Sequence, residues 1–177
     1  MDLYIALCGP DPASPEVAAQ AESIGRLLAR AGAILVCGGL GGVMQAACRG
    51  AAAQGGTSIG ILPGPDRAAA NPYLTWSIPT GMGEMRNALI VRSADAVIAV
   101  AGEFGTLSEI ALALKTGVPV VGLGTWELAK RGRVVDAFIR AASPEEAVTR
   151  AVELAAGRRA RPRDHVERLG GGRAGPA

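Results

Sequence analysis

The sequence Ala96-Val97-Ile98-Ala99-Val100-Ala101-Gly102-Glu103-Phe104-Gly105-Thr106-Leu107-Ser108-Glu109 joins an apolar run to a glycine turn and then to a helical pattern. The apolar run predicts a buried strand, and Thr106 is the expected start of a helix over residues 106–115. A strand, a glycine turn and a helix in this order direct free backbone amides at one point, where the helix dipole adds partial positive charge. The stretch therefore predicts a site for a phosphate group, with Glu109 one helical turn further on.

The same alternation of strand and helix signals runs along the rest of the chain. Helix-start signals such as Ser14-Pro15-Glu16 and Ser143-Pro144-Glu145-Glu146 precede helical patterns. The predicted strands cover residues 3–8, 33–37, 57–62, 74–78, 96–100 and 120–123, with one more inside 134–141. The predicted helices cover residues 15–31, 43–54, 84–92, 106–115 and 144–156. This pattern predicts a single-domain α/β fold of Rossmann-like type, a parallel sheet with helices on both faces.

Charge is distributed unevenly along the 177 residues. We predict one domain over residues 1–157 and a disordered, solvated Arg/Gly-rich tail over residues 158–177. The formal net charge of +2 favours neither nucleic acid nor a membrane surface as a partner. No apolar run approaches the roughly 18 residues of a membrane span, and the first residues lack the basic region of a signal peptide.

The three cysteines, Cys8, Cys37 and Cys48, are odd in number and do not have the spacing of a metal site. Cys8 and Cys37 end apolar runs, so we expect them to be buried small hydrophobic residues. A reduced, cytoplasmic setting fits this usage. We expect no metal ion and no resident cofactor.

Glycine turns follow three of the predicted strands, at Gly9, at residues 38–42 and at residues 102–105. In an open parallel sheet, ligands bind beyond the carboxyl ends of the strands, near the switch in strand order. One glycine turn is commonly a tight turn only, but three at one edge indicate close approach of the backbone to a ligand.

Three common motifs are absent: the dinucleotide fingerprint, the P-loop and the serine-hydrolase elbow, and the single histidine is His165. The remaining interpretation is a mononucleotide or a similar phosphate-bearing ligand.

Two charged residues have both a functional and a purely structural interpretation. Arg86 follows Gly81-Met82-Gly83 near the start of a predicted helix, where a cation opposes the helix dipole and needs an anionic partner. That partner is either a ligand or Glu84 or another neighbouring acid. Glu109 either closes a capping box with Thr106 or lies beside the phosphate, where it binds ribose hydroxyls or stabilises positive charge on the sugar.

These segments together resemble the LOG ("Lonely Guy") family of Rossmann-type proteins, long misannotated as lysine decarboxylases. The resemblance spans roughly residues 3 to 125. The segments that carry it are Met85-Arg86-Asn87, Ala94-Asp95-Ala96, the turn from Gly102 to Glu109, and Gly38-Gly39-Leu40-Gly41-Gly42-Val43-Met44. The segment from Thr80 to Asn87 is similar to a shorter branch of the family that includes molybdenum-cofactor carrier proteins.

The resemblance implies an enzyme that cleaves the N-glycosidic bond of a nucleoside 5′-monophosphate, giving a free base and ribose 5-phosphate. The family's essential arginine and glutamate match Arg86 and Glu109, the expected catalytic pair. The resemblance also implies a homodimer or homotetramer. With the glycine turns, it gives the expected ligand-binding residues: Gly9, Gly38, Gly39, Gly41, Gly42, Thr80, Met85, Asn87, Gly102, Gly105 and Thr106.

The chain departs from the family pattern Pro-Gly-Gly-x-Gly-Thr-x-x-Glu at two positions. Ala101 replaces the proline and Glu103 replaces the second glycine, which places a carboxylate in a turn expected to hold phosphate. The usual lysine after Arg86 is Asn87.

Three hypotheses follow: a nucleoside-monophosphate glycosidase, a non-catalytic carrier of a phosphorylated ligand such as molybdenum cofactor, and, more weakly, nucleic-acid recognition by the arginine-rich tail.

Overall fold

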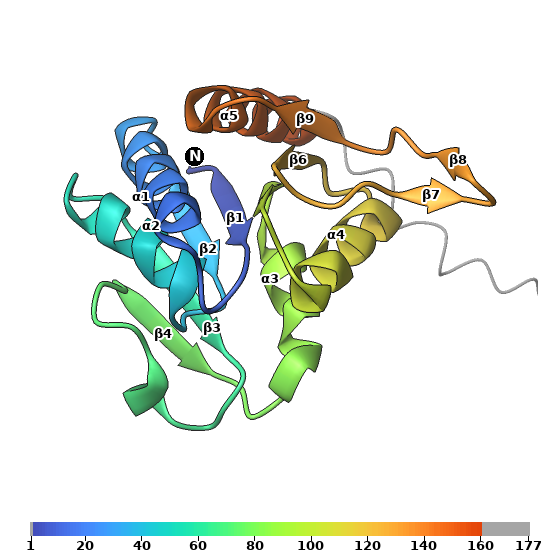
Figure 1. The fold of residues 1–177 in the computed structure, drawn as a ribbon. Helices are drawn as coiled ribbons and strands as arrows, with labels where there is room; N and C mark the ends of the chain where they lie inside the picture. Colours follow the sequence, from blue (N-terminus) through green and yellow to red (C-terminus); the bar gives the residue numbers. More distant parts are fainter. Residues whose placement is uncertain (1, 161–177) are drawn as a thin grey trace, which may run out of the picture.

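The computed structural model describes residues 2–160 and has a seven-stranded sheet, in which all neighbouring strands are parallel (Figure 1). The strands run in the order β4-β3-β2-β1-β5-β6-β9. Their bounds are β1 (Tyr4–Cys8), β2 (Ile34–Cys37), β3 (Ser58–Leu62), β4 (Trp76–Pro79), β5 (Ala96–Val100), β6 (Val120–Leu123) and β9 (Ile139–Ala141). The direction of winding reverses between β1 and β5, which makes that position the topological switch point.

Helices cover both faces of this sheet, as the sequence predicts (Figure 1). One core packs α1 (Pro15–Arg30), α2 (Gly42–Ala52) and α5 (Pro144–Ala160) against the strands. The other packs α3 (Asn87–Ser93) and α4 (Phe104–Thr116) against the opposite face. Two 3₁₀ turns, η1 (Arg67–Ala69) and η2 (Gly83–Arg86), flank β4. The fold class predicted from the sequence is therefore confirmed.

Two glycines allow α1 and α2 to pack backbone against backbone. A Cβ added to Gly25 would lie 2.0 Å from the carbonyl oxygen of Ala47, and one added to Gly50 would lie 2.0 Å from that of Glu22. No side chain fits in these gaps. This close contact explains why two good helices contain glycine in their interiors, where it normally costs stability.

The prediction missed a small hairpin between β6 and β9. The strands β7 (Ala129–Lys130) and β8 (Arg133–Val134) pair antiparallel around a two-residue loop. Both loop residues, Arg131 and Gly132, have positive φ, which is typical of the tight turns that join hairpin strands. All four strand residues are exposed, so no apolar periodicity marked the hairpin in the sequence.

The last helix is longer than predicted, because α5 continues to Ala160 instead of ending at residue 156. Arg158 donates through Nη1 to the carbonyl oxygen of Ala94 at 2.9 Å. Arg159 pairs with Asp95 at 2.6 Å, and the same carboxylate accepts the backbone N–H of Tyr4 at 2.9 Å. The first residues of the predicted tail therefore belong to the folded domain. The rest of that segment, and any interaction of it with nucleic acid, lies outside the described residues.

Asp95, directly before β5, accepts the N–H of Tyr4 in β1 and pairs with Arg159 in α5. Asp95→Ala therefore leaves Tyr4 and Arg159 without their acceptor. We expect a loss of about 2–3 kcal/mol in the free energy of unfolding, because Asp95 is largely buried. The matched control is Glu153→Ala, which breaks an exposed pair with Arg150 and costs less than about 0.5 kcal/mol. Urea unfolding followed by circular dichroism measures both, and equal losses would contradict the assigned role of Asp95.

Candidate functional site

The carboxyl ends of β1 and β5 are in direct contact at the switch point. A Cβ added to Gly9 would lie 2.7 Å from the carbonyl oxygen of Val100, so only glycine allows the two turns to meet. The turn after β5 then passes through Ala101 and Gly102 into α4. The structure thus brings these two glycine turns together, and the third predicted turn meets them at Pro10 and Asp11.

The helix that begins at this place has no side-chain cap. Its N-cap residue is Glu103, whose side chain makes no hydrogen bond to the first turn. The first backbone bond of α4 runs from the N–H of Leu107 to the carbonyl oxygen of Glu103 at 3.0 Å. The N–H groups of residues 104–106 precede it and point out of the helix. They are available to an anion.

The glycine loop before α2 is different, because the chain supplies acceptors for two of its N–H groups. The N–H of Gly41 donates to Asp11 Oδ2 at 3.1 Å, and the N–H of Val43 donates to the carbonyl oxygen of Pro10 at 3.1 Å. A Cβ added to Gly42 would lie 2.3 Å from that same oxygen. The sequence analysis did not identify Asp11, although its position in the turn after β1 was a usable signal. Neither helix has a side-chain cap, but in the described part of the chain α4 has three successive unpaired N–H groups, those of residues 104–106, whereas the N–H of Val43 in the first turn of α2 is paired.

Of the two interpretations of Glu109, the capping box with Thr106 is wrong, because α4 begins two residues earlier than expected. Thr106 lies inside the first turn, is 3% exposed, and packs under Gly102, where an added Cβ would lie 2.6 Å from the threonine Cβ. Glu109 therefore does not cap the start of α4. Side chains tilt toward the N-terminus of their helix, so its carboxyl group is directed back toward the open turn.

Glu109 is 7% exposed, and the pKa of its carboxyl group is raised. Burial raises its pKa to about 7, against the opposing effects of the nearby Arg86 charge and a hydrogen bond with the Cys8 thiol. Burial also raises the pKa of Cys8, and the neighbouring Glu109 adds to that shift. Near neutral pH the carboxyl group is therefore present in both its protonated and its ionised form.

Arg86 ends η2 and is 8% exposed. Its guanidinium lies against Gly38 at the end of β2, where an added Cβ would be 2.4 Å from Nη1. Within residues 2–160 it forms no ion pair, and its buried Nε has no hydrogen-bond partner. The predicted alternative of a structural pair with Glu84 is thus not found. Burial lowers the pKa of Arg86, and the charge of Glu109 opposes that shift.

We call Cys8, Arg86, Glu109 and the N–H groups of residues 104–106 the switch-point site. Asn87 supports it from behind, because its Nδ2 donates to Ser108 Oγ at 3.0 Å and that hydroxyl donates to the carbonyl oxygen of Gly105 at 2.7 Å. These two bonds join α3 to the first turns of α4.

Two of the predicted ligand-binding residues, Thr80 and Gly39, have structural contacts, and a third, Met85, is exposed. The hydroxyl of Thr80 donates to the carbonyl oxygen of Leu62 at 2.7 Å and so holds the turn after β4. Met85 is 76% exposed, beside the buried Arg86. A Cβ added to Gly39 would lie 2.7 Å from Leu62, so this glycine packs against β3. A role in ligand binding for these residues stays a prediction.

The two departures from the family pattern have a structural basis. Ala101 has a φ of 48°, a left-handed conformation that proline does not adopt, and its N–H donates to the carbonyl oxygen of Leu123 at 3.0 Å. Glu103 is exposed, with extended backbone, and its carboxylate does not cap the amides of α4. The acidic residue in this turn thus leaves the open amides accessible.

The cysteines are free and buried, as expected for Cys8 and Cys37. Across residues 2–160, no cluster of three or more His, Cys, Asp or Glu side chains could hold a metal ion. In the same part of the chain, none of the helices has the length and apolar character needed to cross a membrane.

A Rossmann-like sheet with an open helix N-terminus at its switch point defines a class of phosphate-binding α/β domains. The model of the SLOG cluster4 family matches residues 2–148, and the chain belongs to that family. This confirms the resemblance to LOG-like proteins. An uncharacterized protein of Archaeoglobus fulgidus is 40% identical over 146 residues, which cover 82% of this chain and 92% of that protein.

Solved structures of molybdenum-cofactor proteins are similar along most of the chain. The molybdenum cofactor binding protein of Rippkaea orientalis is 34% identical, with a TM-score of 0.79 over 87% of this chain and 98% of that one. The molybdenum cofactor carrier protein of Chlamydomonas reinhardtii is 33% identical, with a TM-score of 0.78 over 88% of this chain and 99% of that one. DNA processing protein A of Helicobacter pylori shares the fold alone, at 19% identity and a TM-score of 0.65.

The acidity of Glu109 makes the stability of the protein depend on pH. An acid whose pKa is raised on folding contributes stability that is present below its unfolded pKa of 4.5 and is lost as the pH rises through about 7. The shift corresponds to about 3 kcal/mol. Between pH 5 and pH 8 the free energy of unfolding should therefore fall, and Glu109→Gln should remove most of that fall. Urea titrations at several pH values measure it; a variant with the wild-type pH profile would contradict the assignment.

Ala101 provides a test of the turn itself. Ala101→Pro loses the N–H bond to Leu123 and fixes φ near −65°, so we expect a loss of about 3 kcal/mol or more in the free energy of unfolding. Ala101→Gly relieves a left-handed strain of about 1–2 kcal/mol and loses about 0.5–1 kcal/mol through backbone entropy. The glycine variant should thus be as stable as wild type or slightly more so in thermal unfolding. A proline variant of wild-type stability would show that the turn has another conformation.

Proposed function

We propose that this chain binds a phosphorylated pterin of the molybdenum-cofactor type and carries it without chemical change. The observation that carries the proposal is the buried guanidinium of Arg86, which forms no ion pair within residues 2–160, near the open N-terminus of α4. A buried cation without an ion pair is costly, the nearby charge of Glu109 offsets that cost in part, and a bound anion reduces it further. The names of the similar structures from Rippkaea orientalis and Chlamydomonas reinhardtii support the choice of cargo.

In this proposal the phosphate group accepts hydrogen bonds from the N–H groups of residues 104–106. Charge-assisted bonds of this kind are roughly twice as strong as neutral ones. Arg86 contributes its positive charge from the β2 side, where it lies against Gly38. Glu109, when protonated, donates a hydrogen bond to the ligand and adds no repulsion to the phosphate.

Hydrolysis of a nucleoside 5′-monophosphate is the second candidate, and the acidity of Glu109 is the observation that favours it. A carboxyl group with a pKa of about 7 is suited to general acid–base catalysis at neutral pH. In that reaction water attacks the sugar carbon, the N-glycosidic bond breaks, and the bonding electrons leave with the base as it gains a proton. Assembly into a homodimer or homotetramer, and a cytoplasmic location, stay predictions from the resemblance.

Arg86→Ala tests the binding site, with Arg92→Ala as a matched control that removes an exposed arginine from the neighbouring α3. Molybdenum cofactor released from a molybdenum enzyme is incubated anaerobically with each protein, which is then separated from free cofactor by gel filtration. We expect wild type and Arg92→Ala to retain molybdenum and pterin in equal amounts, measured by mass spectrometry and by fluorescence of the oxidised pterin. Arg86→Ala should retain at least about tenfold less, since it loses a charged hydrogen-bonding group.

The same proteins are then incubated with AMP, and adenine is followed by chromatography. A carrier gives no adenine above the level of a Glu109→Ala control. Release of adenine by wild type alone would favour the glycosidase. Wild-type protein that retains no cofactor would contradict the carrier proposal.

A further inference from the structure

Phe104 is an exposed aromatic ring at the mouth of the switch-point site. It is the first residue of α4, directly before the open N–H groups of Gly105 and Thr106, and its side chain is 76% exposed. Burying a phenylalanine side chain completely is normally among the larger stabilising terms in a fold. The chain leaves this ring in water at the position where a phosphorylated ligand would arrive.

Trp126 holds the ring of Phe104 in place from another part of the fold. The two ring centroids are 5.6 Å apart and the ring planes make an angle of 39°. The indole Nε1 donates to the carbonyl oxygen of Glu103 at 3.3 Å, so the tryptophan is tied to the N-cap of α4. The ring contact and this hydrogen bond place Trp126 beside Phe104, and we call the pair the aromatic platform.

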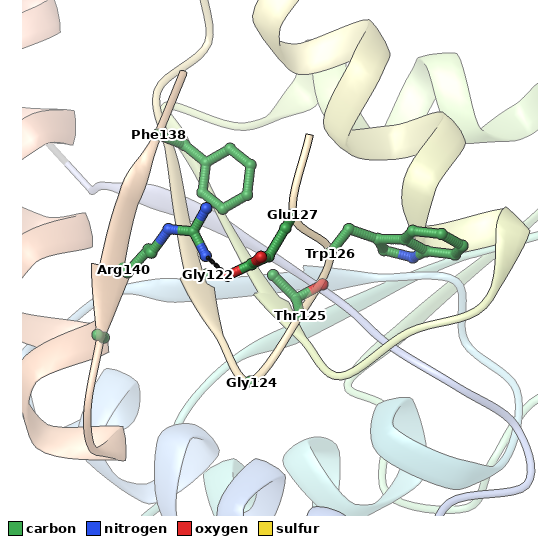
Figure 2. A pocket seen from close by; sticks show the side chains of 8 residues that line it. Gly122, Gly124, Thr125, Trp126, Glu127, Phe138 and Arg140 are labelled. Atoms are coloured by element: carbon green, nitrogen blue, oxygen red, sulfur yellow. Dashed lines mark hydrogen bonds and ion pairs between the residues drawn. The ribbon is translucent and has the colours of Figure 1, made fainter. Parts of the chain in front are cut away.

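The loop that carries Trp126 also lines a cavity of about 190 Å³ beyond the carboxyl ends of β6 and β9 (Figure 2). Arg140 pairs with Glu127 at 2.7 Å in this cavity, as the dashed line in Figure 2 shows. The hydroxyl oxygen of Thr125 is buried and has no hydrogen-bond partner in the described structure. The charged pair of Glu127 and Arg140 thus lines the same cavity as Trp126, and the hydroxyl of Thr125 is enclosed beside it.

We propose that the aromatic platform of Phe104 and Trp126 is the subsite that stacks the planar fused ring, a pterin or a purine, of the ligand whose phosphate binds at α4. The inference rests on the proposed function, because it takes the phosphate position from it. Stacking accepts any flat π system and does not require a particular hydrogen-bonding edge. The platform therefore selects for the ring class, and the polar groups near Thr125 distinguish between members of the class.

Fluorescence provides a direct measurement, because the chain contains two tryptophans, Trp76 and Trp126. In a Trp76→Phe background, Trp126 reports alone. The ligands are molybdenum cofactor, GMP and ribose 5-phosphate, which has the phosphate and no ring. We expect the two ring-bearing ligands to quench Trp126 and ribose 5-phosphate to leave it unchanged.

Phe104→Ala, in the same background, should weaken binding of the ring-bearing ligands by about 5- to 100-fold, the range that removal of one stacking partner produces. Its affinity for ribose 5-phosphate, measured by calorimetry, should stay at the wild-type value. Val134→Ala is the matched control, since it shortens another exposed apolar side chain, on the β7–β8 hairpin. It should change neither affinity.

The outcomes separate the two proposals. If wild type binds the cofactor and Phe104→Ala binds it equally well, the platform is not the ring subsite, while the phosphate site stands. If Phe104→Ala changes the elution volume in gel filtration and not the affinity, the platform is an interface between copies of the chain and the inference fails. If wild type binds none of the three ligands, the proposed function fails and the inference fails with it.

Discussion

The account depends on one constraint: the N-terminus of α4 is left open beside a buried arginine. In this fold, Ser14 caps α1, and Asp11 and Pro10 accept the N–H groups of Gly41 and Val43 before α2. The first turn of α4 has no such partner, although it lies at the switch point of the sheet. Free N–H groups and a buried guanidinium are both unfavourable in isolation, and a bound phosphate would satisfy them together.

The fold class followed from the sequence, because β-to-α alternation and helix-start signals are local features. Strand β5 was predicted at its observed bounds, since an all-apolar run that follows Asp95 and leads into a glycine turn has one simple interpretation. The β7–β8 hairpin was not predicted, because its strands are short and exposed. The start of α4 was placed two residues late, since Thr106 is a better N-cap by type than Glu103. That error produced the capping box, an explanation of Glu109 that the structure removes.

The candidate site was predictable only where its residues carry a local sequence signal. Arg86 and Glu109 stood out through a family motif, and the fold puts both among its few buried charged residues. The glycines of residues 38–42 looked like a second phosphate turn, because sequence does not show that Asp11 already occupies that loop. Phe104 and Trp126 are 22 positions apart and meet only through the packing of α4 against the β6–β7 connection. The sheet by itself does not define a ligand, because one fold hosts many functions.

The most direct test of the central claim is a titration of the ¹⁵N-labelled protein with ribose 5-phosphate, followed by NMR. If the open turn of α4 binds phosphate, the amide proton resonances of Gly105 and Thr106 move downfield with a common saturation curve. Those of Gly41 and Val43 stay in place, because their N–H groups already have partners. Movement of the α2 amides with no change at α4 would contradict the account.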